Sequence, residues 1–280
     1  MLAKCYCRPG LYDQYIHPMR FIDKIRSARE YVVFYVGLAL LASISLLWSI
    51  FALPMNIILP IKLRKLAGRW VISMGFRLYL RALSALGACH FDISALDTLS
   101  DESPMVIAPN HPSLLDAIMI LSRMPRLACI MKAELVDNPF FGAGARLACY
   151  IRNDALRHML HLAVEELRGG SHLLLFPEGT RSHPLPIGTI RGSIALIAKQ
   201  AHVPIQTLLI TADSPFLGKG WPFFRKPTMP IHYRIEIGRR FDPPTDVRRS
   251  MAELETYFHS ALTGNPLPPN AAAAAADELE

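Results

Sequence analysis

A histidine and an aspartate five positions apart, His111 and Asp116, are the residues best suited to acid–base chemistry in this sequence. On a continuous α-helix, side chains at this spacing point about 140° apart, so they meet only if the chain bends between them. Pro112 supplies a bend, because proline disfavours helical geometry at the preceding residue and fits the first helical position. We therefore expect His111 to cap a helix that begins at Pro112, with its imidazole folded back onto Asp116. That contact fixes the ring tautomer and leaves the other nitrogen free to take a proton from a hydroxyl.

The same two residues also have a simpler interpretation. His111 can be a capping or packing histidine, and Asp116 an acid that the helix dipole favours in a first turn. The spacing alone does not separate the two interpretations, because such pairs often arise by chance. A second motif favours the catalytic one.

That second motif follows a short apolar run at 171–176, which predicts a buried strand leading into the polar turn 177–182. Gly179 permits a positive φ or the close approach of another group. Arg181 offers a planar fork suited to phosphate, and Glu178 can hold that fork or a substrate hydroxyl. Taken alone, the turn is equally compatible with an ordinary surface turn that carries an ion pair.

Together, the runs NHPSLLD at 110–116 and FPEGTRS at 176–182 resemble the two principal motifs of the glycerolphosphate/lysophosphatidate acyltransferase family, the PlsC-like 1-acyl-sn-glycerol-3-phosphate acyltransferases. Their order and spacing match, and the resemblance covers about residues 80–220. The segments that add to it are Lys132-Ala-Glu-Leu, Pro139-Phe-Phe-Gly142, Ile151-Arg-Asn153 and Val203-Pro-Ile205. Pro112-Ser113 departs from the pair that many members carry, which bears on the acceptor's identity more than on the chemistry.

The resemblance implies a role for each motif residue. His111 is the base, Asp116 is its partner, and the second and third motifs bind the phosphate or polar head of the acceptor. By position, the substrate-binding residues are Asn110, Arg152, Glu178, Gly179, Thr180 and Arg181. The resemblance further implies acyl-CoA or acyl-carrier protein as the donor, with no metal and no cofactor.

The expected reaction is direct acyl transfer to a lipid hydroxyl. His111 deprotonates the acceptor, whose oxygen attacks the donor thioester, and backbone N–H groups at the helix start after Pro112 steady the oxyanion. An acyl-enzyme on Ser113 is the covalent alternative, which the family does not use. The resemblance favours a lysophosphatidate-like acceptor, and the alternatives are a lyso-ornithine lipid, another lysophospholipid and an aryl-polyene-type lipid.

Two other classes of protein fit the sequence less well. A thioesterase or lipase would carry a G-x-S-x-G nucleophile elbow, and the sequence has none. A non-catalytic membrane lipid-binding protein would be expected to have lost the His, Asp, Glu or Arg of the motifs, and all of them are intact.

Composition favours a membrane enzyme. Hydrophobic residues make up 51% of the 280-residue chain, and its mean hydropathy is +0.25. Residues 31–61 carry no charge, a run long enough for one crossing and too short for two. Basic residues flank both ends of the run, which favours the cytoplasmic side for both flanks. A single tilted span and a re-entrant hairpin, bent near Pro54 or at Ser43–Ser45, are the two alternatives.

The charge balance has two possible explanations. A net charge of +7 and a pI near 9.3 suit either nucleic acid or an anionic lipid surface. No nucleic-acid motif accompanies the charge, so we expect membrane lipids as partners and no nucleic acid. Location at the inner membrane, with the catalytic domain on the cytoplasmic side, follows from the basic flanks; the sequence leaves the oligomeric state open.

The pattern of elements predicts an α/β fold, a mixed central sheet flanked by helices, behind an N-terminal membrane-embedded helical segment. Residues 1–30 form a polar and basic lead, 31–61 the embedded segment, 62–265 the acyltransferase domain and 266–280 a low-complexity tail. Residues 62–86 are expected to form a basic amphipathic helix. Expected strands lie at 89–93, 105–108, 127–131, 173–176, 205–210 and 231–237, and further helices at 113–123, 155–168 and 190–201. Strand ends should carry the site.

Overall fold

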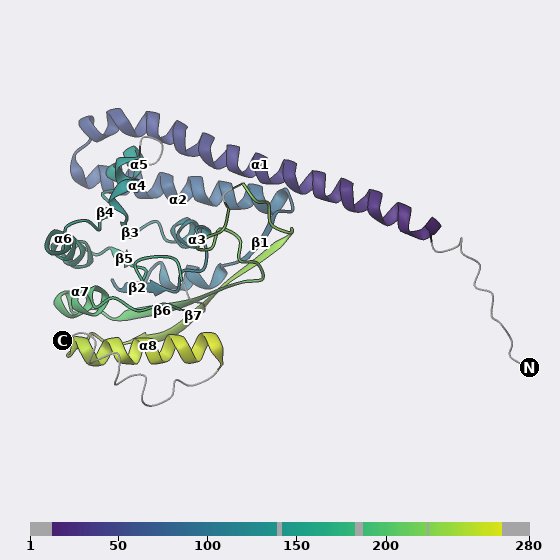
Figure 1. Ribbon diagram of the computed structural model, residues 1–280. Coiled ribbons are helices and arrows are strands. Elements are labelled where there is room, and N and C mark those ends of the chain that lie inside the picture. Colours follow the sequence, from purple (N-terminus) through teal and green to yellow (C-terminus); the bar gives the residue numbers. More distant parts are fainter. Residues whose placement is uncertain (1–12, 139–141, 183–186, 223, 265–280) are drawn as a thin grey trace, which may run out of the picture.

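A seven-stranded sheet, covered by helices on both faces, forms the centre of the protein in this computed structural model, which describes residues 13–138, 142–182, 187–222 and 224–264 (Figure 1). The strand order is β1-β7-β6-β2-β5-β3-β4, and all neighbours are parallel except the antiparallel pair β6–β7. The strands are β1 Cys89–Asp92, β2 Val106–Pro109, β3 Leu127–Met131, β4 Ile151–Arg152, β5 His172–Leu174, β6 Ile205–Ala212 and β7 Ile231–Phe241. The mixed α/β fold expected from the sequence is confirmed.

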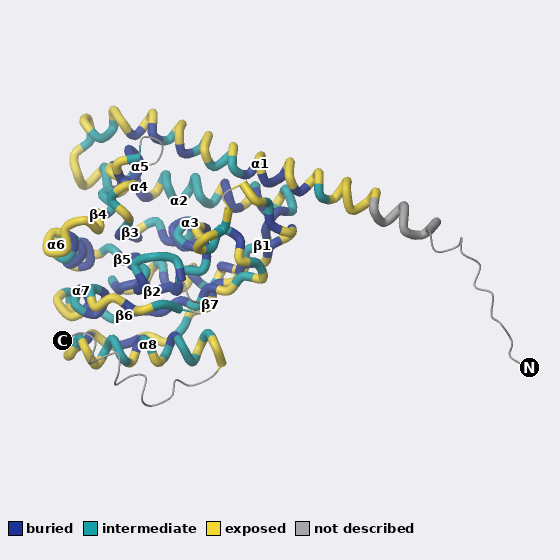
Figure 2. Tube along the Cα trace, in the orientation of Figure 1, coloured by how far each residue is buried: buried dark blue, intermediate teal, exposed yellow. Residues whose placement is uncertain are grey.

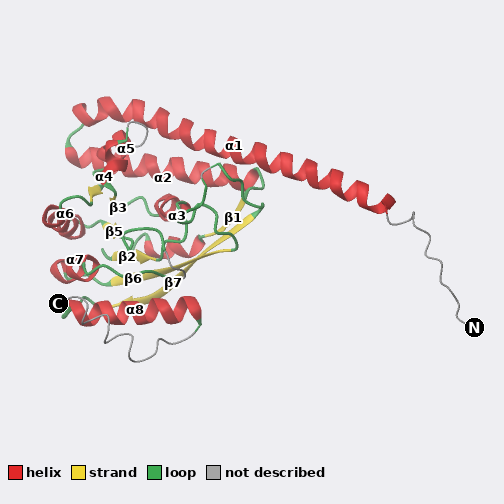
Figure 3. Ribbon diagram, viewed as in Figure 1, coloured by secondary structure: helices red, strands yellow, loops and turns green. Residues whose placement is uncertain are grey.

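The helices divide between the two faces of the sheet (Figure 3). On one face α2 and α3 pack against the strands and α1 covers α2; on the other face lie α6, α7 and α8. Their bounds are α1 Asp13–Ile58, α2 Ile61–Ala85, α3 Leu115–Arg123, α4 Ala133–Asp137, α5 Gly142–Leu147, α6 Leu156–Arg168, α7 Ser193–Ala201 and α8 Val247–Thr263, with a 3-10 helix η1 at Ser94–Leu99. The sequence pattern did not predict β4, α4, α5, η1 or α8.

Two hydrophobic cores result, one on each face of the sheet. Side chains alternate across a strand, and β2 shows this directly: Val106 and Ala108 join one core and Ile107 the other. All three are fully buried. A strand covered on both faces reads as a continuous apolar run, which is why these strands were visible in the sequence.

Of the two alternatives for the apolar segment, the hairpin bent near Pro54 or at Ser43–Ser45 does not form, because α1 is continuous through both places. The packing of Ala52 and Met55 against α5 keeps this part of the chain helical in spite of the proline. A hairpin does form, but its turn lies at Leu59 and Pro60 and its second arm is α2. Pro60, at φ −65° and ψ 152°, is the N-cap of α2. The expected boundary at residue 31 falls inside α1, and the expected tail at 266–280 lies outside the described residues.

The outer face of the α1–α2 hairpin is largely exposed (Figure 2), and many of its exposed side chains are large and apolar. Within α1, Phe21–Ile58 is long and apolar enough to cross a membrane, with an 18-residue window of mean hydropathy 2.2. Its exposed large side chains continue onto α2, and Ile57 reaches 88% exposure. The set comprises Phe21, Ile22, Ile25, Tyr31, Val32, Tyr35, Val36, Leu46, Leu47, Ile50, Phe51, Leu53, Ile57, Ile58, Ile61, Leu63, Leu66, Trp70 and Leu78.

Candidate active site

The two sequence motifs meet because β2 and β5 are parallel neighbours, with Ile107 opposite Leu174. Carboxyl ends of parallel strands lie at one edge of a sheet, so the loops that follow them converge. His111 follows β2, and the turn at 176–182 follows β5. Lys132 follows β3, which pairs with β5, and therefore reaches the same edge.

The expected pairing of His111 and Asp116 is present. The Nδ1–H of His111 donates to Oδ2 of Asp116 at 2.9 Å, and the same oxygen accepts the backbone N–H of Ser113 at 2.7 Å. The Asp116 side chain is fully buried. The local geometry differs from the expectation, since α3 begins at Leu115 rather than at Pro112, and the bend is a turn over residues 112–114.

The environment of the pair holds the imidazole in one orientation. Burial raises the pKa of the Asp116 carboxyl, while the His111 contact and the Ser113 N–H act in the opposite direction. Phe176 stacks on the His111 ring, with centroids 3.9 Å apart and planes 23° from parallel. One ring nitrogen is therefore committed to the carboxylate while the ring itself lines a cavity.

Ser182 joins the two motifs directly. Its hydroxyl accepts the backbone N–H of His111 at 3.2 Å, and its own N–H donates to the His111 carbonyl at 2.8 Å. The hydroxyl in turn donates to Oε1 of Glu178, whose Oε2 accepts the N–H of Gly188 at 2.7 Å. Glu178 is thus buried and holds the turn together, so its predicted role in binding substrate stays a prediction.

The Asn110 side chain, like that of Glu178, is used in hydrogen bonds within the protein. Its amide donates to the carbonyl of Ile210 at 3.0 Å and accepts the N–H of the same residue at 2.7 Å, and it is buried. These bonds tie the end of β2 to β6 just before His111. Contact between Asn110 and substrate stays a prediction.

The remaining motif residues divide into two groups. Gly179, Thr180 and Arg181 line the cavity beside His111, and one Arg181 Nη donates to the carbonyls of Leu217 and Gly218. Their predicted role in binding substrate stays a prediction.

Arg152 lies elsewhere. It is 42% exposed, forms salt bridges of 2.7 Å with Asp137 and with Asp154, and is absent from the described residues that line the cavity. The two carboxylates raise the pKa of its guanidinium through their hydrogen bonds. The structure does not bring Arg152 together with the other predicted residues, so its part in binding stays a prediction.

The expected oxyanion site at the start of α3 is not available. The N–H of Ser113 is bound by Asp116, and the N–H groups of Leu114, Leu115 and Asp116 donate to Leu217, Ser113 Oγ and the Ser113 carbonyl. Ser113 itself is buried and its hydroxyl donates to the carbonyl of Phe216 at 3.0 Å. These contacts make Ser113 a poor nucleophile and leave no free backbone donor between residues 113 and 116.

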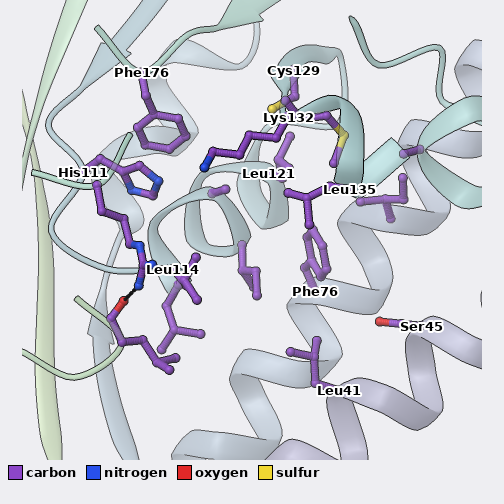
Figure 4. A pocket seen from close by; sticks show the side chains of 18 of the residues that line it. Leu41, Ser45, Phe76, His111, Leu114, Leu121, Cys129, Lys132, Leu135 and Phe176 are labelled. Atoms are coloured by element: carbon purple, nitrogen blue, oxygen red, sulfur yellow. Dashed lines mark hydrogen bonds between the residues drawn. The ribbon is translucent and has the colours of Figure 1, made fainter. Parts of the chain in front are cut away.

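The cavity beside His111 has a volume of about 1180 Å³ and is mainly apolar (Figure 4). His111, Phe176 and Lys132 surround one part of it, and the Lys132 amine points toward His111. Leu41 and Ser45 of α1 and Phe76 of α2 line the part that reaches the helical hairpin. The cavity thus connects a polar end at His111 with an apolar end beside the exposed hairpin.

Three residues at this site were not recognised from the sequence as functional. Lys132 stood in a matching family segment without an assigned role, and its position directly after a predicted strand was the available signal. Phe176 and Ser182 belong to the second motif, but stacking and bridging are tertiary contacts that spacing does not reveal. Within the described ranges, no three His, Cys, Asp or Glu side chains gather closely enough to hold a metal ion.

Comparisons with known proteins agree with this site. The family model described as Acyltransferase matches residues 90–211. The chain is 27% identical over 233 residues to a Pseudomonas aeruginosa 1-acyl-sn-glycerol-3-phosphate acyltransferase, covering 80% of this chain and 84% of that protein. It is 30% identical over 206 residues to a lyso-ornithine lipid O-acyltransferase of the same organism, covering 69% and 73%.

A solved structure shows the same fold. The 1-acyl-sn-glycerophosphate (LPA) acyltransferase PlsC from Thermotoga maritima matches with a TM-score of 0.60 at 21% identity, covering 91% of this chain and 97% of that one. The paired His111 and Asp116, the turn at 176–182 and these relatives lead to one conclusion. The chain belongs to the PlsC-like acyltransferase family and is an acyltransferase.

Proposed function

We propose that this protein is a membrane-bound O-acyltransferase that moves a fatty acyl group from a thioester donor to the hydroxyl of a lysophosphatidate-like lipid. The observation that carries the proposal is the His111–Asp116 pair at the polar end of a large apolar cavity, with Lys132 and Arg181 beside it. The apolar part suits an acyl chain, and the two cations suit an anionic head group.

The reaction needs one base and no covalent enzyme intermediate. His111 takes the proton of the acceptor hydroxyl, and the oxygen forms a bond to the thioester carbonyl carbon. The tetrahedral oxyanion then collapses, the carbon–sulfur bond breaks, and His111 returns the proton to the leaving thiolate. Asp116 stabilises the imidazolium between these two steps, because its carboxylate contacts Nδ1.

Stabilisation of the oxyanion falls to a side chain, since the N–H groups at the start of α3 are engaged. Lys132 is the cation whose amine points toward His111 in the cavity (Figure 4). A preorganised positive charge in a largely apolar cavity is effective against developing negative charge. Lys132 therefore serves the oxyanion, the acceptor's anionic head, or both in sequence.

A lyso-ornithine lipid is the second candidate acceptor, because the relative named for that activity is 30% identical to this chain. Lysophosphatidate is preferred, since the cavity carries the cations Lys132, Arg181 and Arg191 and a phosphate monoester has more negative charge than an ornithine head group. Acyl-CoA or acyl-carrier protein is the proposed donor, and the reaction uses no metal or cofactor.

Membrane association is indicated by the apolar α1 and by membership of a lipid acyltransferase family. We place the α1–α2 hairpin along one face of the inner membrane, with the catalytic domain on the cytoplasmic side. Val33, Phe34 and Ala52 of α1 are buried against the domain, so α1 is held along it and its opposite face meets the lipid. Cytoplasmic placement rests on the basic flanks of the apolar run and on the donor.

A product screen by mass spectrometry tests this function. Purified protein in micelles is given lysophosphatidate, a lyso-ornithine lipid or another lysophospholipid, each with acyl-CoA and with acyl-carrier protein. We expect phosphatidate, and we expect His111→Ala to lower turnover roughly 10²-fold or more, the usual contribution of a positioned general base. Near-normal turnover of a folded His111→Ala protein, or product only from phosphate-free acceptors, would contradict the proposal.

A further inference from the structure

Arg191 is a cation at the cavity that neither motif includes. It lies between the turn at 176–182 and the start of α7, and its backbone N–H donates to the carbonyl of Pro177 at 2.8 Å. The residue is exposed and lines the main cavity together with His111 and Arg181. The turn therefore brings Arg191 to the same cavity as His111, although 80 residues separate them in sequence.

Gly179 makes room for the Arg191 side chain. A Cβ added at Gly179 would lie 2.7 Å from Nε of Arg191 and 3.1 Å from its Cδ and Cζ. The guanidinium thus lies directly over the bare backbone of the glycine, whose φ is +66°. The sequence predicted that Gly179 permits a close approach, and within this structure the approaching group is Arg191.

The charge of Arg191 is not neutralised by the protein around it. Among the described residues, no carboxylate lies within salt-bridge distance of its guanidinium. Glu178 is the acid nearest in sequence to Gly179, but both of its oxygens are already bound, by Ser182 and by Gly188. A planar guanidinium with free donors at a cavity wall suits a phosphate oxygen pair.

A second, smaller cavity of about 300 Å³ adjoins the same residue. It is lined by Glu178, Thr180, Gly188, Thr189 and Arg191. Thr180 and Arg191 line the main cavity as well, so these two side chains form a shared wall. Thr180 and Arg191 are thus the residues with side-chain donors that both cavities share.

We propose that Arg191 and Thr180 form a phosphate subsite between the two cavities, separate from the cations Lys132 and Arg181. The inference rests on the proposed function, which brings two phosphate-bearing substrates to this edge of the sheet. The phosphate comes either from the acceptor's head group or from the phosphopantetheine arm of the donor. In both cases Gly179 is required to be glycine because a side chain there would displace the guanidinium.

Binding measurements test the subsite without relying on turnover. In a His111→Ala background, calorimetry in micelles measures the Kd of glycerol 3-phosphate and of CoA for Arg191, Arg191→Gln and Arg191→Lys proteins. We expect Arg191→Gln to weaken one of the two probes at least tenfold, and Arg191→Lys to recover part of the loss because it keeps the charge. An unchanged Kd for both probes would overturn the subsite, whatever the enzyme's activity proves to be.

Turnover then identifies the source of the phosphate. If the acceptor supplies it, the loss in kcat/KM caused by Arg191→Gln disappears when monoacylglycerol replaces lysophosphatidate. If the donor supplies it, the loss disappears when an acyl-N-acetylcysteamine thioester replaces acyl-CoA. A loss of the same size with both phosphate-free substrates would show that Arg191 acts only on the structure of the turn, and would refute the subsite.

Two further variants serve as checks. Arg126→Gln is the matched control, because Arg126 is exposed and precedes β3, at the sheet edge opposite the site. It should leave both Kd values unchanged. Gly179→Ala should weaken the binding of the same probe as Arg191→Gln. The double variant should bind that probe about as weakly as the weaker of the two single variants, because both changes act through one guanidinium. A fully additive double variant would contradict the contact between the two residues.

Discussion

Nδ1 of His111 lies 2.9 Å from Oδ2 of Asp116, and the backbone N–H of Ser113 reaches the same oxygen at 2.7 Å. One carboxylate oxygen therefore both orients the imidazole and closes the turn that follows it. The second oxygen, Oδ1, is buried without a hydrogen-bond partner among the described residues. A buried charge without a hydrogen-bond partner lowers the stability of the fold. Such groups are concentrated at functional sites.

Asp116→Asn should separate the effect of the carboxylate on turnover from its effect on stability. Turnover should fall by about 10²-fold to 10⁴-fold, as when a triad aspartate is replaced, because an amide does not stabilise the imidazolium. The folded protein should be no less stable at neutral pH, since the amide removes the cost of burying a charge.

The pH dependence of the free energy of unfolding shows whether the buried Asp116 charge destabilises the fold. Burial raises the pKa of Asp116 above its ordinary value of 3.8, so the folded state binds the proton more tightly than the unfolded state. Wild-type stability relative to Asp116→Asn should therefore fall as pH rises from 3.8 through the raised pKa, and then level off. Denaturant titrations of both proteins across this range measure it; a wild-type advantage that grows with pH would contradict the buried-charge argument.

Ser182→Ala should loosen the connection between the two motifs. The hydroxyl accepts from the His111 backbone and donates to Glu178, so its loss frees the histidine loop from the turn. We expect kcat to fall by roughly tenfold with little change in KM, and stability to fall by about 1 kcal/mol for the lost hydrogen bonds. Ser260→Ala in α8 removes a comparable side-chain bond, to the Tyr257 carbonyl, and should leave kcat unchanged. Equal kcat losses in both variants would argue against the link.

Glu166→Gln should destabilise the junction between the hairpin and the domain. Glu166 of α6 binds Arg69 of α2 at 2.8 Å and also pairs with Lys65, and both Arg69 and Glu166 are buried. Removing one partner leaves a buried, uncompensated arginine, a change that costs about 3–5 kcal/mol.

The pH dependence of stability and a control variant at Glu165 test whether the Glu166 carboxylate stabilises this junction. Arg69 and Lys65 outweigh desolvation and lower the pKa of Glu166 below its ordinary 4.5. The stability this acid contributes is therefore present above pH 4.5 and is lost as pH falls through the lowered pKa. Glu165→Gln, at an exposed neighbour that contacts only His161 through an ion pair, should change stability little. A difference between the two variants that persists unchanged in acid would contradict the assignment.

Replacing Leu47 and Phe51 together by Asp should release the protein from lipid vesicles. Both side chains are more than half exposed on α1, and burial of each in lipid contributes about 1.5–3 kcal/mol. We expect vesicle partitioning to fall at least tenfold, measured by sedimentation with vesicles of mixed anionic and neutral phospholipid. Ile237→Asp on β7 is the control with an exposed apolar residue away from the hairpin. Unchanged partitioning of the α1 variant would rule out this face as the lipid contact.

The contact between His111 and Asp116 and the membership of the family could be predicted from the sequence motifs, because chemistry fixes residue types and local spacing. The strands at 106–109 and 127–131 were also visible, since fully buried strands are short apolar runs. Spacing could not place the turn of the hairpin at Pro60 rather than near Pro54, because packing on α5 decided which proline the helix tolerated. Nor could it show that α3 starts at Leu115.

The sequence by itself determined that an imidazole, a carboxylate and a phosphate-type turn occur in one α/β domain behind an apolar segment. Only the tertiary structure decided how they are used, because neighbouring strands come from distant parts of the chain. The pairing of β2 with β5 brings Ser182 to His111, and the next strand, β3, brings Lys132. The same arrangement leaves Arg152 among Asp137 and Asp154, away from the cavity, and lays Arg191 over Gly179. Such contacts depend on strand order, which no local pattern of residues encodes.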